Sequence, residues 1–496
     1  MSGRKLTLDH VWIIAALALI GLRPLIATIP PHDFWWHMAT GRMIVTQGRI
    51  PQTDSFSYTR AGEPFYNQGW LAQVGLYRIH QIGGIELLVL VQALVMVLAY
   101  GLLLWLCIQR SGALRLSVAL LLVGAMPVSF SNWLVRPQSY AIPLFVAFLL
   151  ILTWWRLGDS WPATRMRAPL WLLPPLMVLW VNLHGSFVLG GGLIALTFIG
   201  EGGRRIVARW RHAEVSGPPL RHLLLWGGVT AAALLINPRG FAVLVYVQNL
   251  LSSSQVTRLV EEWAPPTIRD TGGQLFFGFL LVFALILIYA RKRPDPVDLL
   301  ITGVFLWLAL GAVRNVLWVV IVMLPLMTIQ AATRVPLPRG KSFAGNATIN
   351  MAITLVLVIL VVLGLPWIKP HLDLPPDIGG LLDPNTPVAA VEVLRNDPQR
   401  PTHLFHAMGY GSYLIWAAPE QKVFVDPRIE LYPFSQWQEY IVLGSGHDVD
   451  LIVAKYAIDG LLLDVKEQQD LLTLMRTKPG WAVRYEDERT VYMVRN

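Results

Sequence analysis

Long apolar runs are the feature of this sequence that most limits its fold. A helix needs about 17–25 largely apolar residues to cross about 30 Å of hydrocarbon. Hydrophobic residues make up 54% of the 496-residue chain and charged residues 14%, against about 45–50% and about 25% in soluble globular proteins. We therefore predict an α-helical polytopic membrane protein with crossings near residues 11–29, 85–108, 117–131, 138–155, 169–183, 186–200, 222–237, 274–290, 297–312, 315–332 and 347–368.

The charges divide the chain into two unlike parts. Residues 1–368 carry 28 Lys/Arg and 13 Asp/Glu, a balance of +15, whereas residues 369–496 carry 12 and 18, a balance of −6; together they give the net charge of +9. The basic excess therefore lies in the most apolar part of the chain. This distribution is typical of a membrane protein and argues against a nucleic-acid partner, which a high isoelectric point alone would have suggested.

The basic loops predict the topology, because cytoplasmic loops of membrane proteins are enriched in Lys and Arg. Together with the N-terminal pair Arg4 and Lys5, five loops alternate correctly if the chain crosses eleven times with a cytoplasmic N-terminus. The segment 69–83 then does not cross, and we expect an amphipathic helix on the outer surface. The five loops contain Arg110 and Arg115; Arg156, Arg165 and Arg167; Arg204, Arg205, Arg209, Arg211 and Arg221; Arg291, Lys292 and Arg293; and Arg334, Arg339 and Lys341.

This topology predicts a transmembrane domain over residues 1–368, with a long first outer loop over 30–84, and an extracytoplasmic domain over 369–496. The tail begins with a turn-rich stretch and continues with alternating apolar runs. We predict a small α/β domain with strands at 423–428, 459–464 and 483–495. Helices are expected between them near 434–443 and 466–478.

Polar residues of several chemical types gather at the predicted outer ends of the helices, whereas the cytoplasmic ends offer mainly Arg and Lys. Ionisable groups near the membrane are costly and are often functional, so we interpret the outer face as a candidate site. Helix caps and loop solvation are the alternative interpretation. The residues are Asp33, His37, Arg136, Gln138, Asn182, His184, Asn237, Arg239, Arg314 and Asn315.

The strongest local signal follows the first crossing, where Asp33 and His37 stand four residues apart. On a helix they would share one face. Asp33 is a candidate general base toward a hydroxyl, a candidate ligand of a divalent cation such as Mg²⁺ or Mn²⁺, or only a helix cap. Asp54 and Glu63 lie further along the same loop, and Asp54 is a candidate catalytic partner of Asp33.

Three arginines are candidates for binding a phosphate group of a substrate, because a guanidinium group binds phosphate through two hydrogen bonds and keeps its charge. Arg136, Arg239 and Arg314 are candidates for holding a lipid-linked phosphate, with Gln138 and His184 beside them. Contact with lipid headgroups, or a simple turn cap in the case of His184, is the other possibility.

At these residues the sequence resembles the GT-C superfamily of membrane glycosyltransferases. Asp33-Phe-Trp-Trp-His37 is similar to the opening of the first outer loop in oligosaccharyltransferase catalytic subunits, although no second acidic residue adjoins Asp33 and no Trp-Trp-Asp-Tyr-Gly motif follows. A broader likeness is to uncharacterised prokaryotic members near these enzymes. It rests on Trp35-Trp-His37 followed by Gly41, and on Asp54-Ser-Phe, Arg136-Pro-Gln138, Asn182-Leu-His184-Gly185, Asn237-Pro-Arg-Gly240, Glu262-Trp263, Arg314-Asn315 and Val425-Asp426-Pro-Arg428-Ile-Glu430-Leu-Tyr432. The stretch Gly409-Tyr-Gly-Ser-Tyr413, followed by the Asp426 segment, resembles only the setting of the missing Trp-Trp-Asp-Tyr-Gly motif.

The resemblance implies transfer of a sugar from a polyprenyl-phosphate donor to a glycan, lipid or protein acceptor at the outer face of a prokaryotic inner membrane, within the cell envelope. It implies that Asp33 acts as base or metal ligand, and one base fits an inverting single displacement. A transporter or flippase of lipid-linked glycans is the first alternative, although inverted repeats and mid-membrane charges are not evident. A non-catalytic membrane scaffold is the second.

Overall fold

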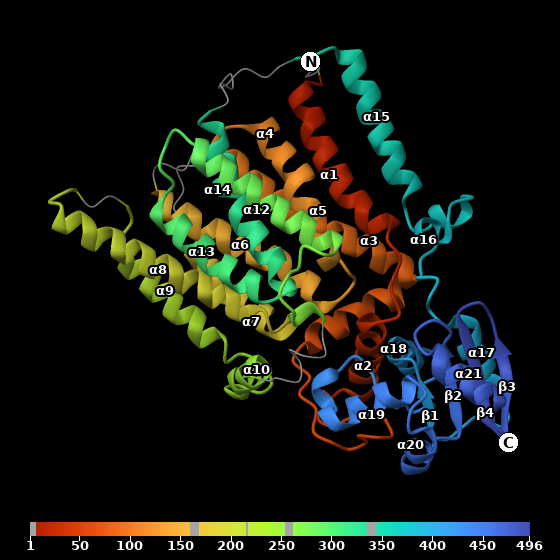
Figure 1. The fold of residues 1–496 in the computed structure, drawn as a ribbon. Helices are drawn as coiled ribbons and strands as arrows, with labels where there is room; N and C mark the ends of the chain where they lie inside the picture. The colour runs from red at the N-terminus through yellow and green to blue at the C-terminus, as the bar shows by residue number, and fades with distance from the viewer. Residues whose placement is uncertain (1–5, 159–167, 215–216, 253–260, 335–343) are drawn as a thin grey trace. The chain divides into compact units, whose positions relative to one another are not determined.

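The computed structural model describes residues 6–158, 168–214, 217–252, 261–334 and 344–496. The chain forms two compact units. We call Met1–Ile26, Val89–Val247 and Val260–Ile368 the helical unit, and Ala27–Leu88, Gln248–Leu259 and Lys369–Asn496 the sheet unit. Each is described by itself, and both are drawn in Figure 1.

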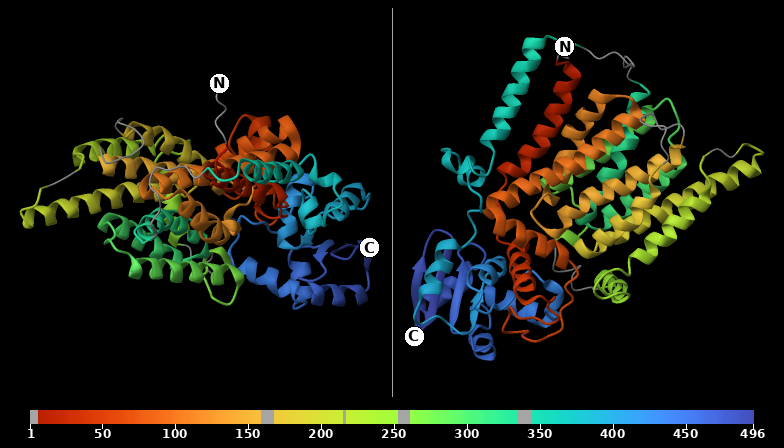
Figure 2. Two further views of the ribbon diagram at one scale, coloured as in Figure 1. Left: turned by 90° about the horizontal axis from the view of Figure 1, so that it is seen from above. Right: turned by 180° about the vertical axis from the view of Figure 1, so that it is seen from behind.

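The helical unit is a bundle of apolar helices, as the hydropathy predicted. Across the described residues of the whole chain, six helices are long and apolar enough to cross a membrane and three more are shorter, which confirms a multi-pass membrane protein; the number of eleven crossings stays a prediction. The helices α1 and α15 lie side by side in both views (Figures 1 and 2) and pack on one another. The main helices are α1 (Leu8–Ile26), α4 (Leu114–Ala119), α5 (Met126–Ser129), α6 (Pro137–Leu157), α7 (Leu173–Leu183), α8 (Phe187–Trp210), α9 (Leu220–Ala233), α10 (Ala242–Ser252), α12 (Thr271–Tyr289), α13 (Pro296–Gly311), α14 (Val316–Ala332) and α15 (Ala347–Leu363).

Local chemistry explains where several of these helices begin. The first backbone N–H groups of a helix have no partner within it, and short polar side chains supply one. Asp270 accepts a hydrogen bond from the backbone of Gly273 before α12, and Asp295 accepts one from Val297 before α13. A proline at the first helical position, as in α6 and α13, requires no such partner.

One long helix, α3 (Trp70–Ser111), is interrupted at two glycines. Gly83 and Gly84 have non-helical backbone angles, and φ of Gly84 is +69°, which glycine adopts at little cost because it has no Cβ. The helix therefore divides into an N-terminal part that begins at Trp70 and a C-terminal part that contains the apolar run. The division matches the predicted boundary between the segment 69–83 and the crossing 85–108.

The sheet unit contains a four-stranded sheet in the order β1-β2-β4-β3. The strands are β1 (Leu404–His406), β2 (Gly460–Asp464), β3 (Trp481–Glu486) and β4 (Thr490–Arg495). The strand β1 runs parallel to β2, whereas β4 is antiparallel to both β2 and β3. Its helices are α2 (Asp33–Gln47), α16 (Pro376–Gly379), α17 (Val388–Asn396), α18 (Met408–Ala417), α19 (Phe434–Gly444), α20 (Val449–Lys455) and α21 (Gln469–Thr477).

Most elements predicted for the tail are confirmed, and one is wrong. The run 459–464 forms β2, and α19 and α21 lie where helices were expected. The run 483–495 was predicted as one strand but divides into two antiparallel strands, β3 and β4, joined by a turn. The predicted strand 423–428 is not a strand: Val423 makes only an isolated bridge to Ser57. Pro427 has no N–H to donate to a ladder, and the backbone N–H of Arg428 donates to the Asp426 side chain instead.

Close backbone contacts hold α2 in the sheet unit. A Cβ on Gly41 would lie 2.1 Å from the backbone oxygen of Gln73, so α2 and the N-terminal part of α3 can approach this closely only because residue 41 is glycine. On the other side of α2, the backbone N–H of Trp36 donates to Oγ of Ser412 in α18 at 3.0 Å. The start of α2 is therefore fixed by contacts on two sides.

Candidate functional site

Asp33 lies in the first turn of α2 and is half-buried. The N-cap residue, His32, makes no side-chain hydrogen bond to the helix. The partial positive charge of a helix N-terminus favours a carboxylate in this position. The sequence analysis considered a helix here, on which Asp33 and His37 share a face, and the fixed start of α2 gives the carboxylate a defined position.

His37 follows Asp33 by one turn of α2 and contacts a short chain of amides. Its Nδ1 lies 3.0 Å from Nε2 of Gln73, and Oε1 of Gln73 accepts a hydrogen bond from Nδ2 of Asn67 at 2.7 Å. Because an amide nitrogen can only donate, Nδ1 of His37 is the acceptor and the ring proton of the neutral form is on Nε2. The His37 ring also packs against Trp36, with 3.7 Å between ring centroids.

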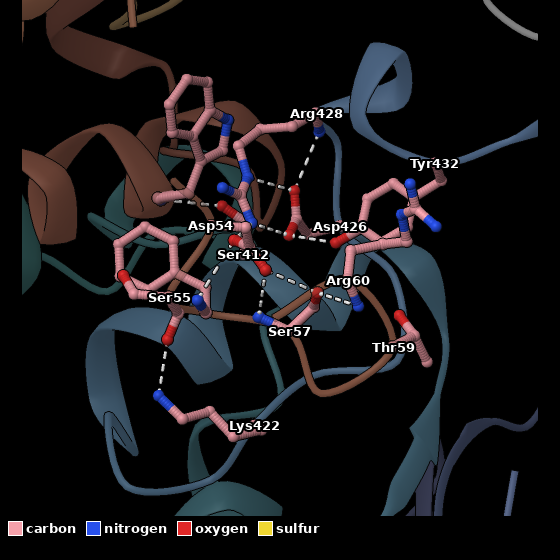
Figure 3. A network of polar contacts seen from close by, with 12 residues as sticks. Asp54, Ser55, Ser57, Thr59, Arg60, Ser412, Lys422, Asp426, Arg428 and Tyr432 are labelled. Atoms are coloured by element: carbon pink, nitrogen blue, oxygen red, sulfur yellow. Dashed lines mark hydrogen bonds and ion pairs between the residues drawn. The ribbon is translucent and has the colours of Figure 1, made fainter. Parts of the chain in front are cut away.

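Asp54 is buried in an ion network rather than facing an open site (Figure 3). Its Oδ1 contacts Nη2 of Arg428 at 2.7 Å, and its Oδ2 accepts hydrogen bonds from the backbone and the hydroxyl of Ser57. Nε and Nη2 of Arg428 also donate to the two oxygens of Asp426, at 2.8 and 2.6 Å. The hydroxyl of Tyr432 donates to Asp426 at 2.6 Å. We call Asp54, Asp426, Arg428 and Tyr432 the Arg428 network.

Asp426 and Arg428 stay charged although both are almost fully buried. Burial alone would raise the pKa of Asp426, but the Arg428 guanidinium and the hydrogen bonds of Arg428 and Tyr432 hold that pKa below its ordinary value. Burial alone would lower the pKa of Arg428, and Asp426 together with Asp54 raises it well above its ordinary value. The guanidinium also lies 5.1 and 5.0 Å from the ring centroids of Phe56 and Phe65, an arrangement that favours a cation.

The network fixes a short turn that presents one further carboxylate, Glu430. This residue lies in the turn Ile429–Leu431, between Arg428 and Tyr432. Solvent reaches its side chain, yet the protein atoms around it raise its pKa, and the charges of Asp426 and Asp33 raise it further. The charge of Asp33 thus acts on Glu430, a coupling that sequence reasoning did not anticipate. Residue spacing gives no signal for this pairing, because the two lie at opposite ends of the chain.

In the helical unit, Arg136 and Glu262 form a partly buried ion pair. Arg136 is the N-cap of α6, and its Nη1 donates to Oε1 of Glu262 at 2.7 Å. The Arg136 side chain is 9% exposed and the Glu262 side chain 39%. Gln138, two residues after Arg136, is buried and donates to Oδ1 of Asn132 at 3.4 Å. The sequence had singled out Arg136 and Gln138 but not the partner of Arg136.

Three of the predicted phosphate-binding residues come together at this end of the helical unit. Burial, and after it the charges of Arg314 and Arg136, lower the pKa of His184 to about 3. The backbone N–H of Ser186 donates to Nδ1 of His184 at 3.1 Å, so the proton of the neutral ring is on Nε2. Arg314 lies over the ring of Trp263, 4.4 Å from its centroid. We call Arg136, His184 and Arg314 the arginine cluster.

Arg239 lies on a turn whose shape is determined by Asn237. The side chain of Asn237 donates to the backbone oxygens of Leu234 and Gly240 and accepts from the backbone N–H of Arg239 at 2.8 Å. Asn182 joins this turn to α7, because its Nδ2 donates to the backbone oxygen of Ile236 at 2.9 Å. These contacts give the asparagines a structural role, and a phosphate-binding role for Arg239 stays a prediction.

The residues that the structure describes do not form a metal centre, since nowhere among them do three or more His, Cys, Asp or Glu side chains gather in a way that could hold an ion. The alternative in which Asp33 is a metal ligand therefore gains no support from its described neighbours.

Similarity to known proteins appears in the fold and not in the sequence. No protein-family model matches the chain, and no curated protein matches it by sequence. The fold is similar to that of the archaeal oligosaccharyltransferase AglB from Archaeoglobus fulgidus, solved with an inhibitory peptide and dolichol-phosphate: the TM-score is 0.52 at 13% identity, over 97% of this chain and 73% of that one.

Two further solved structures are similar over the same share of this chain. ArnT from Cupriavidus metallidurans, bound to undecaprenyl phosphate, has a TM-score of 0.50 at 11% identity, over 97% of both chains. The mycobacterial arabinofuranosyltransferase AftD has a TM-score of 0.50 at 12% identity, over 97% of this chain and 41% of that one. All three are membrane glycosyltransferases of the superfamily that the sequence motifs resemble. The chain thus has the fold of the GT-C superfamily of membrane glycosyltransferases.

Proposed function

We propose that the protein is a membrane glycosyltransferase that moves a sugar from a polyprenyl-phosphate donor to an acceptor hydroxyl. The observation that carries this proposal is the arginine cluster, where two guanidinium groups and a histidine from three separate parts of the helical unit come together. An excess of positive charge near the end of a membrane helix is suited to a lipid phosphate.

The opposite end of α6 provides an internal comparison. Arg156 there donates to Asp298 and Asp295, each at 2.6 Å, and to Glu201 at 3.2 Å. Arg110 pairs with Asp298 and Arg204 with Glu201, so three arginines meet three carboxylates. We call these six residues the Arg156 cluster. Its charges balance, whereas in the arginine cluster Arg136 donates to Glu262 and Arg314 lies over the ring of Trp263.

Structural similarity supports the same ligand chemistry. The AglB structure contains dolichol-phosphate and the ArnT structure contains undecaprenyl phosphate. We propose that Arg136 and Arg314 hold the phosphate of such a lipid and that Nε2–H of His184 donates to it. Arg239 and Gln138 are proposed to complete this side of the site. The membrane is proposed to be a prokaryotic inner membrane, with the arginine cluster and residues 369–496 at its outer face and the N-terminus in the cytoplasm.

We propose Asp33 as the general base. The acceptor oxygen attacks the anomeric carbon, the bond from that carbon to the phosphate oxygen breaks, the hydroxyl proton passes to Asp33, and the lipid phosphate leaves with the electron pair. A single base implies inversion at the anomeric carbon. Glu430 would contact the acceptor beside Asp33. His37 and Asp54 are proposed as positioning residues. His37 would orient α2, and Asp54 would fix the turn that carries Glu430.

The deciding experiment uses the purified full chain in lipid nanodiscs with undecaprenyl-phosphate-linked sugars and a set of glycan, lipid and peptide acceptors. We expect sugar on an acceptor together with released undecaprenyl phosphate. In sealed vesicles, donor that crosses the bilayer without transfer would instead identify a flippase, and donor binding with neither outcome would identify a scaffold. Loss of donor binding in Arg136→Gln, with the fold retained, would confirm where the phosphate binds.

A further inference from the structure

The guanidinium that is proposed to bind phosphate already has an anionic partner. Oε1 of Glu262 accepts a hydrogen bond from Nη1 of Arg136 at 2.7 Å. Burial would raise the pKa of Glu262, but Arg136 and then Arg314 hold it below its ordinary value, so the carboxylate is ionised and faces both arginines. A largely buried guanidinium requires such a counter-ion, because an uncompensated buried charge is costly.

The neighbouring residue holds the second arginine. Trp263 follows Glu262 in the turn Glu261–Trp263, and its ring lies under Arg314 with 4.4 Å between the guanidinium carbon and the ring centroid. A backbone hydrogen bond joins the same two segments. The N–H of Val313, next to Arg314, donates to the oxygen of Ala264, next to Trp263, at 2.9 Å. Two adjacent side chains of one turn thus contact both arginines of the arginine cluster.

We infer that Glu262 is an internal competitor for the phosphate site and that its charge favours the donor over the spent lipid phosphate. This inference rests on the proposed function. A sugar linked through one phosphate is a phosphodiester with one negative charge, and transfer leaves a monoester whose second proton has a pKa near 6, giving a charge of about −1.5 to −2 at pH 7. Two arginines alone would bind the product more tightly than the donor.

A carboxylate that already binds Arg136 offsets part of this preference. Its charge repels every bound phosphate, and it repels the additional charge of the monoester most. When product leaves, Glu262 again neutralises Arg136, so the guanidinium is not left without an anion. Glu262 thereby weakens product inhibition and speeds release of the spent lipid, while the donor retains enough affinity to bind.

The test compares Glu262→Gln with Glu214→Gln, which removes the same charge from an exposed position of the helical unit. The amide oxygen of glutamine can still accept from Arg136, so the local fold is kept, and thermal stability in nanodiscs checks this. Dissociation constants are measured for undecaprenyl phosphate and for an undecaprenyl phosphodiester of a simple sugar. Inorganic phosphate and phosphatidic acid, added as competitors, distinguish a free anion or an ordinary lipid headgroup from the polyprenyl lipid.

We expect Glu262→Gln to tighten binding of the monoester about tenfold and binding of the diester less than about threefold, with stronger product inhibition and a lower kcat. Glu214→Gln should change neither. An unchanged ratio of the two constants, or weaker binding of both lipids, would overturn the inference, the latter because Glu262 would then merely orient Arg136. If Arg136→Gln leaves both constants unchanged in an otherwise unaltered protein, the proposed function itself fails, whatever Glu262 does.

Discussion

His406 is a titratable side chain that the fold of the sheet unit keeps neutral. It is fully buried, its Nε2 accepts from the backbone N–H of Phe424 at 3.0 Å, and its Nδ1 lies 2.8 Å from the backbone oxygen of Ala407. Both ring nitrogens are therefore used, one as acceptor and one as donor. A second proton would break the bond to Phe424, and burial lowers the pKa of His406 to about 4.

This arrangement predicts how the stability of the sheet unit depends on pH. Because the pKa in the folded state lies below the ordinary value of about 6.5, the unfolded chain binds more protons between these two values. The contribution of neutral His406 to the free energy of unfolding is therefore fully present above about pH 6.5. It is lost as the pH drops toward 4, a loss of about 3 kcal/mol for this group. Thermal unfolding followed from pH 7 to pH 4.5 should show a smaller loss in His406→Gln than in the exposed control His371→Gln.

The proposed role of Asp33 likewise depends on a single side chain, its carboxylate. Asp33→Asn keeps the size of the side chain and removes the base, so we expect the transfer rate to fall by at least about a hundredfold. The dissociation constant for undecaprenyl phosphate should not change. Asp373→Asn, at an exposed position of the sheet unit, is the matched control. Full activity in Asp33→Asn would remove Asp33 from the mechanism.

Among the elements, α2 depends on how closely its backbone approaches α3. In Gly41→Ala the new methyl carbon would lie 2.1 Å from the oxygen of Gln73, so the two helices must separate, at a cost of about 1–3 kcal/mol. Separation also breaks the contact between Gln73 and His37. In Gly75→Ala the methyl group meets no atom within 4 Å, and a helical alanine should stabilise the protein by up to about 1 kcal/mol. Melting temperatures of the two variants should therefore move in opposite directions.

The Arg428 network connects two loops, and its removal should be costly. Arg428→Met keeps much of the side-chain volume but leaves two buried carboxylates, Asp54 and Asp426, without their cation. We expect a loss of about 3–5 kcal/mol in the free energy of unfolding. Denaturant unfolding of Arg428→Met beside the exposed control Arg395→Met measures it. Equal stability of the two variants would show that the carboxylates are satisfied in another way.

Element by element, the sequence predicted what periodicity and hydropathy encode. The helices α19 and α21 and the hairpin of β3 and β4 have clear patterns. The strand β1 was not predicted, because three residues are too few to show alternation. The run 423–428 looked like a strand because of its apolar residues. In the fold those residues are buried by tertiary contacts, and the backbone around Pro427 follows the Arg428 network instead of a ladder.

For the whole molecule, the two ends of α6 should be separable by mutation. Arg136 and Arg156 are twenty residues apart on one helix, about 30 Å. Asp298 accepts hydrogen bonds from Arg156 and Arg110, each at 2.6 Å. We therefore expect Asp298→Asn to lower the melting temperature in nanodiscs without changing the dissociation constant for undecaprenyl phosphate. A changed lipid affinity would mean that the Arg156 cluster is coupled to the arginine cluster.

At this scale the class of protein was predictable and the pairing of its charged groups was not. Hydropathy alone identified the bundle, and the loop arginines were treated as solvated topogenic charges. Arg156 instead proves to be buried among carboxylates from two other helices. Glu262 and Glu430 likewise appear in the sequence motifs, but the sequence did not predict their partners. Which acid meets which arginine depends on how helices from distant parts of the chain pack, and a single sequence does not record that packing.

The contacts around α2 also determine when the sheet unit can be completed during synthesis. Trp36 and its hydrogen-bond partner Ser412 are 376 residues apart. Asp54 and Arg428 are separated by a similar length of chain. At about 5–20 residues per second, a ribosome needs roughly 20–75 seconds to cover that distance. Throughout this time the segment that bears Asp33 has emerged without the helix that holds it in place. The proposed base is thus made well before the residues that surround it.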